Sequence, residues 1–231
     1  MERHFEKELN GLRAKLQEMS RLCEESLVSA SNAYLESDKT LAERSFTNER
    51  MVNTLEIDID HMVADCFALY QPVAIDLRLL LAIQKINNDL ERIGDHCINI
   101  AQSAISCVTF AENPGQLELP KMFQIAQGML HDACESFFTK NLQLARTVLE
   151  SDDMLDELNR SNTREAIQLV KNDSSAIEMA LELLRISRNL ERIGDLSTNI
   201  AEEVIFHVQA RVVKHHRAEM EAESQQVNQA G

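Results

Sequence analysis

The chain has 231 residues, among them six glycines, three prolines and no tryptophan. Because the turns between strands draw on glycine and proline, so few of them exclude an all-β fold, disfavour an α/β fold and predict long helices. The formal net charge of −15 repels phosphate backbones, which disfavours nucleic acids as partners. The same charge attracts cations and basic protein surfaces.

The helices are expected in chain order wherever apolar residues recur at alternating spacings of three and four. We expect six long helices, which include the segments 5–19, 52–69, 86–104, 122–137, 141–172 and a stretch that begins near residue 173. Pro72 marks the turn between the second and third helices. Ser175 and Glu178 have the spacing of a capping box at the start of the sixth.

The cysteines and the N-terminus bear on the compartment. Five cysteines without a CxxC spacing suit neither a disulfide framework nor a zinc site, so we expect reduced, buried thiols in a cytoplasmic protein. The first residues enter a charged amphipathic pattern with no apolar signal region. Asp76 and Arg78 interrupt one of the longest apolar stretches, so no membrane-spanning helix is expected.

An internal repeat organises the chain. Residues 90–101 read LERIGDHCINIA and residues 190–201 read LERIGDLSTNIA, with nine of the twelve positions identical. We therefore predict two tandem, pseudo-symmetric three-helix bundles in an all-α fold. The predicted boundaries are a first unit at 1–111, a linker at 112–118, a second unit at 119–217 and a polar, disordered tail at 218–231.

Acidic side chains repeat with the units. At 100° per residue, Glu91 and Asp95 lie on the helix face opposite the apolar seam, and Glu191 and Asp195 repeat this arrangement. The preceding helix of each unit adds a second row, which is Glu49, Asn53, Glu56 and Asp60 in the first unit and Asp152 and Asp156 in the second. Two such rows in one groove suit a cation that takes carboxylate ligands.

Two interpretations of these rows stay open. One is a metal site, for which the composition does not choose among Mg²⁺, Mn²⁺, Fe and Zn²⁺. The other is a solvated helix face whose charges pair along the helix, for example Asp89 with Lys85 or Arg92, and Arg92 with Asp95. Gly94 and Gly194, at matching positions inside the helices, fit either a metal groove or close helix packing.

The chain carries no recognisable catalytic motif. It has no Gly-rich phosphate loop, no GxSxG motif and no Cys/His nucleophile context. No ExxH motif accompanies the acidic rows, and His96, His131 and His207 are isolated, as expected of surface or packing residues. We expect no catalytic residues, and we keep a metal-dependent phosphohydrolase or oxidase as one alternative and a metal-free helical scaffold as another.

The doubled LERIGD, Gln71-Pro72 followed by Asp76-Leu77-Arg78, and Asn199-Ile200-Ala201-Glu202-Glu203 together resemble the PhoU family of phosphate-uptake regulators over roughly residues 5–216. The resemblance implies a cytoplasmic, non-enzymatic, usually dimeric protein. Such a protein represses the phosphate regulon and connects the ATPase subunit of a phosphate ABC transporter to a sensor histidine kinase. It reaches the membrane only through these partners.

The resemblance also implies metal clusters at surface E/DxxxD motifs. Carried over residue by residue, the metal ligands are Glu49, Asn53, Glu91 and Asp95 in the first unit and Asp152, Asp156, Glu191 and Asp195 in the second. Asn53 stands where the motif expects Asp, so the first site has one negative charge fewer.

Overall fold

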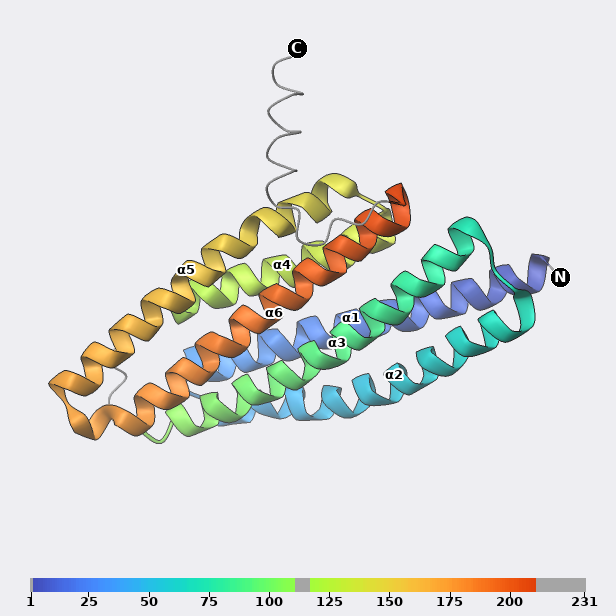
Figure 1. Cartoon of the computed structure of the whole chain (residues 1–231). Coiled ribbons are helices and arrows are strands. Elements are labelled where there is room, and N and C mark those ends of the chain that lie inside the picture. The colour runs from blue at the N-terminus through green and yellow to red at the C-terminus, as the bar shows by residue number, and fades with distance from the viewer. Residues whose placement is uncertain (1, 111–116, 211–231) are drawn as a thin grey trace, which may run out of the picture.

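The computed structural model describes residues 2–110 and 117–210 and contains six long α-helices with two short 3-10 helices. The first unit consists of α1 (Glu2–Leu35), η1 (Lys39–Ala42), α2 (Glu43–Tyr70) and α3 (Ala74–Cys107). The second unit consists of α4 (Leu119–Thr139), α5 (Leu142–Asn172), η2 (Ser174–Ala176) and α6 (Ile177–Gln209). The predicted all-α fold of two tandem three-helix bundles is confirmed (Figure 1).

Most of the predicted linker and all of the tail lie outside the described residues, as do residues 1, 111 and 211–217 of the two predicted units. Among the described helices, none is long and apolar enough to cross a lipid bilayer.

Residues other than glycine form several of the helix ends. Gln71 and Lys140 adopt left-handed φ angles of 47° and 55° at the ends of α2 and α4, where glycine is the usual residue. Pro120 occupies the first turn of α4, and the Asn141 side chain accepts hydrogen bonds from the first backbone amides of α5. The long helices therefore fit a sequence that is poor in helix breakers.

The capping box predicted for α6 is wrong. Ser175 lies in η2, where its backbone amide and its hydroxyl both donate to Asp173 Oδ1, at 2.9 and 2.6 Å. Helix α6 begins after Ala176 without a side-chain cap. The Ser175 side chain does not cap α6 because it is hydrogen-bonded to Asp173 in the preceding turn.

The two bundles share one hydrophobic core. Helix α3 packs along α6 in the antiparallel sense, and α1 contacts α4, so that the centre of the molecule is formed by both units (Figure 1). Two three-helix bundles could each have a separate core, whereas here the buried apolar side chains of both form one continuous cluster. Helices α2 and α5 lie on the outside, α2 against α1 and α3, and α5 against α4 and α6.

Candidate metal centre

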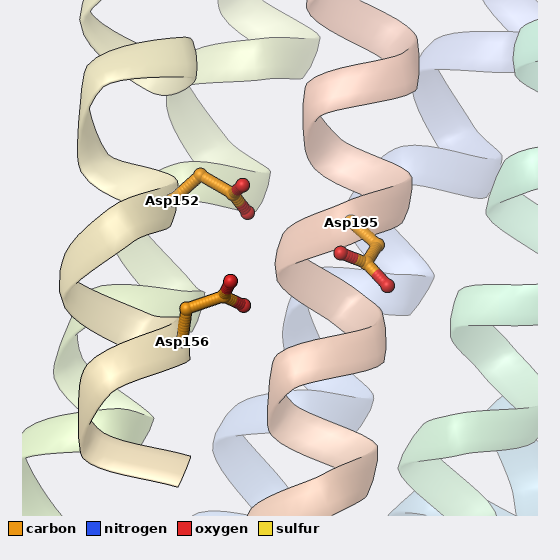
Figure 2. A group of neighbouring side chains, drawn as sticks. All are labelled: Asp152, Asp156 and Asp195. Carbon is orange, nitrogen blue, oxygen red and sulfur yellow. The ribbon is translucent and has the colours of Figure 1, made fainter. Parts of the chain in front are cut away.

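Three aspartates of the second unit come together between α5 and α6. Asp152 and Asp156 lie one turn apart on α5, and Asp195 faces them from α6 (Figure 2). Each offers one carboxylate oxygen, and these three oxygens all lie within 4.8 Å of one another. We call these residues the aspartate triad. All three are partly buried, so they stay accessible from the surface.

Gly194 explains how α5 approaches α6 so closely. A Cβ atom at this position would lie 2.5 Å from Leu155 Cδ2 and 3.7 Å from Asp152 Oδ1. The missing side chain therefore makes room first for a core leucine and second for a triad carboxylate. At Gly94 the neighbour is Val52 Cγ1 at 3.3 Å, so close helix packing explains this glycine.

Glu191 borders the triad. Burial, followed by the negative charges of Asp195 and Asp156, raises the pKa of its carboxyl group. Its Oε2 atom is buried without a hydrogen-bond partner, and Arg192 Nε lies 3.6 Å away. A buried carboxylate oxygen without a hydrogen bond, next to three gathered carboxylates, fits a site for a cation.

Two arginines already pair with the triad. Arg160 Nη2 donates to Asp156 Oδ2 at 3.0 Å, and Arg192 Nη1 donates to Asp195 Oδ2 at 2.9 Å. Burial raises the pKa of Asp195 even though Arg192 acts in the opposite direction. The sequence interpretation did not single out these two arginines. The available signal was their spacing, since Arg160 follows Asp156 by four residues and Arg192 precedes Asp195 by three.

The first unit is arranged differently. Asn53 Nδ2 donates to Glu49 Oε1 at 2.7 Å, so the amide occupies one of the predicted ligands, while Asn53 Oδ1 is buried without a hydrogen bond. Burial and the nearby Asp95 raise the pKa of Glu91, and Asp95 itself is exposed. Within residues 4–110, no three acidic, histidine or cysteine side chains bring their ligand atoms as close together as the triad does.

Asp60, at the end of the first acidic row, has structural partners. Asp60 Oδ1 accepts hydrogen bonds from Gln84 and Asn87 of α3, at 2.5 and 2.8 Å. Of the two carboxylates that the sequence offered to Arg92, the structure places Asp89 Oδ1 3.8 Å from its guanidinium and does not pair it with Asp95. The structure therefore gathers Asp152, Asp156 and Asp195 with Glu191 beside them, and it does not gather Glu49, Asn53, Glu91 and Asp95 in the same way.

Oxygen ligands dominate the candidate centre. His96 contacts Asn189 Oδ1 at 2.8 Å across the two units, His131 contacts Glu24, and His207 is buried near Phe137. The cysteines are free thiols; four are buried, and burial raises the pKa of the half-buried Cys107 to about 11. Carboxylates without thiolates suit Mg²⁺, Mn²⁺ or iron, and Zn²⁺ also accepts them.

Comparison with known proteins agrees with this architecture. The PhoU domain profile matches the chain twice, over residues 16–104 and 119–204. A Burkholderia protein named phosphate-specific transport system accessory protein PhoU homolog is 35% identical, and the alignment covers 91% of each chain. An Aquifex aeolicus protein of the same name is 34% identical, with 94% of this chain and 98% of the relative covered.

Solved structures show the same fold. The crystal structure of PhoU from Pseudomonas aeruginosa superposes with a TM-score of 0.87 at 34% identity and covers 90% of this chain and 100% of that one. The phosphate transport system regulatory protein PhoU from Streptococcus pneumoniae gives a TM-score of 0.83 at 26% identity, with 91% of this chain and 99% of that one covered. The repeated sequence motif, the doubled three-helix fold and these similarities together show that the chain belongs to the PhoU family.

Proposed function

We propose that this protein is a regulatory accessory component of a phosphate transport system. The observation that carries this proposal is the similarity over nine-tenths of the chain to proteins named phosphate-specific transport system accessory proteins. The two-unit fold, shared with a phosphate transport system regulatory protein, supports it. In this role the protein lowers phosphate uptake and represses phosphate-starvation genes when phosphate is plentiful.

The proposed mechanism is that of an adaptor without catalytic activity. One surface contacts the ATPase subunit of a phosphate ABC transporter and another contacts a sensor histidine kinase, while the protein itself works in the cytoplasm as a homodimer. The net charge of −15 favours basic docking surfaces on these partners. Charge complementarity of this kind chiefly sets the rate and specificity of association.

The proposed metal site lies in the second unit. Asp152, Asp156 and Asp195 would hold a divalent cation, because one oxygen of each already lies close to the other two. Glu191, whose carboxyl group feels the charges of Asp195 and Asp156, would be a further oxygen ligand. The bound cation would supply positive charge that offsets the clustered carboxylates. In the first unit, Glu49, Asn53, Glu91 and Asp95 form the weaker candidate, since the Asn53 amide competes for Glu49.

The test removes the α6 side of this site. Glu191→Ala combined with Asp195→Ala is expected to derepress phosphate-starvation genes in high phosphate. The physical reason is that the acidic surface between α5 and α6, which we propose is regulatory, loses two of its carboxylates. A reporter fused to a phosphate-starvation promoter measures the effect. Far-UV circular dichroism checks that the helices are intact, as expected for partly exposed side chains.

A matched control removes two exposed carboxylates away from the site, Glu165→Ala on α5 combined with Glu178→Ala on α6. The control variant should repress normally, since neither residue lies in the triad. Normal repression in the Glu191/Asp195 variant would contradict the regulatory role of this surface. Phosphate release by purified, metal-loaded protein would instead favour the metal-dependent enzyme, and purification without bound metal would favour a metal-free scaffold or adaptor.

A further inference from the structure

Two aspartates of the triad form ion pairs with arginine side chains of the protein. The Asp156–Arg160 and Asp195–Arg192 ion pairs come from opposite sides, one from α5 and one from α6. Both arginine side chains are more than half exposed, at 64% and 53%, so they can turn away without disturbing the core. The side chains of their aspartate partners are less exposed, at 29% for Asp156 and 37% for Asp195.

This pairing is specific to the second unit. Arg92 occupies the position of Arg192 in the first repeat, yet its nearest carboxylate is Asp89 at 3.8 Å and not Asp95. On α5, Arg164 lies one turn beyond Arg160 and pairs with Glu157 at 3.0 Å, outside the triad. Contact with the triad is therefore particular to Arg160 and Arg192. The equivalent Arg92 and the neighbouring Arg164 do not contact the candidate metal ligands.

The arginines and a metal ion would compete for the same aspartate carboxylates. Carboxylates that lie one turn apart on a helix repel each other, and guanidinium groups offset this repulsion when no metal is bound. A dication would need the same carboxylates. A guanidinium that stays near the triad would repel it, and one that leaves would lose its ion pair. Either way, the arginines lower the affinity of the triad for metal.

We propose that Arg160 and Arg192 are built-in competitors of the metal ion, which hold the aspartate triad in a charge-balanced form and set the metal affinity at which they are displaced. This inference rests on the metal site proposed above. Metal loading would then turn two guanidinium groups toward solvent. Free guanidinium groups bind carboxylates and phosphates in a bidentate manner, so the loaded site would present a new basic surface to a partner.

The test titrates the full-length protein with Mn²⁺ by isothermal calorimetry, comparing the wild type with Arg160→Gln combined with Arg192→Gln. An exposed ion pair is worth about 0.2–1 kcal/mol, so loss of both should tighten Mn²⁺ binding about two- to thirtyfold. Arg92→Gln and Arg164→Gln are the matched controls and should leave the affinity unchanged, because neither side chain pairs with the triad.

An unchanged or weaker affinity in the double variant would overturn the proposal, since the arginines would then be neutral or would position the ligands. Absence of Mn²⁺ binding in every variant would overturn the metal site as well. Thermal unfolding gives a second readout: without metal the double variant should melt below the wild type, and Mn²⁺ should raise its Tm more than that of the wild type. Equal rises in Tm would contradict the competition.

Discussion

Gly94 and Gly194 occupy equivalent positions in the repeat but have different surroundings. A Cβ atom at Gly94 would lie 3.3 Å from Val52 Cγ1, slightly tighter than an ordinary contact. At Gly194 the corresponding distance to Leu155 Cδ2 is 2.5 Å, and Leu155 is fully buried. Glycine is therefore required for the close packing of α5 on α6 in the second unit. In the first unit the packing of α2 on α3 leaves almost enough room for a Cβ atom.

We expect Gly194→Ala to be the more harmful of the two matched substitutions. Alanine gains about 1 kcal/mol of helix propensity at either position, whereas overpacking a core costs about 1–3 kcal/mol. Gly94→Ala should therefore leave the free energy of unfolding nearly unchanged, and Gly194→Ala should lower it by up to about 2 kcal/mol. Urea unfolding followed by circular dichroism measures both, and equal effects would contradict the argument.

The packing of α3 against α6 includes a charged contact across the two units. Lys85 Nζ lies 2.7 Å from Glu203 Oε1, and the glutamate side chain is only 6% exposed. The lysine also lies over the Phe206 ring, with its Nζ atom 5.5 Å from the ring centroid. The second glutamate oxygen is buried without a hydrogen bond, so Lys85 is the main compensation for this charge.

Lys85→Met should destabilise the fold by about 1–3 kcal/mol, because it leaves the buried Glu203 carboxylate unpaired. The full penalty of a buried pair is not expected, since the lysine is 46% exposed and water reaches the site. Adding Glu203→Met should recover most of the loss, because the buried charge is then gone as well. A double-mutant cycle from chemical unfolding provides the measurement, and additive effects of the two substitutions would contradict the pairing.

At the scale of the whole molecule, the two units share their most extensively packed helices. The cluster of buried apolar residues extends from Leu9 in α1 to Ile205 in α6 without a break between the units. Each unit by itself would expose the face of α3 or α6 that now packs against the other. The pseudo-symmetric repeat is therefore one structural unit in terms of stability.

We expect the protein to unfold in a single cooperative transition. A shared core couples the two bundles, so the calorimetric enthalpy of unfolding should equal the van't Hoff enthalpy. Differential scanning calorimetry at low protein concentration tests this expectation. Two resolved transitions, one for each bundle, would show that the contact between α3 and α6 does not couple them.

Much of the fold follows from local sequence patterns. The spacing of apolar residues predicts the six helices, and the segment predicted at 141–172 agrees with α5 and its Asn141 cap, because the helical period is a property of each segment alone. The repeated LERIGD predicts the two units, since equal sequences form equal local structures. The acidic rows on single helices follow from the same period.

The sequence by itself thus determined the helices, their repeat and the carboxylates that each helix presents. Only the tertiary structure decided that Asp152, Asp156 and Asp195 meet, that Arg192 contacts the triad while Arg92 does not contact Asp95, and that the two cores are one. The physical reason is that distances between helices depend on how side chains such as Val52 and Leu155 pack at the crossing points. Identical motifs therefore have different surroundings in the two units.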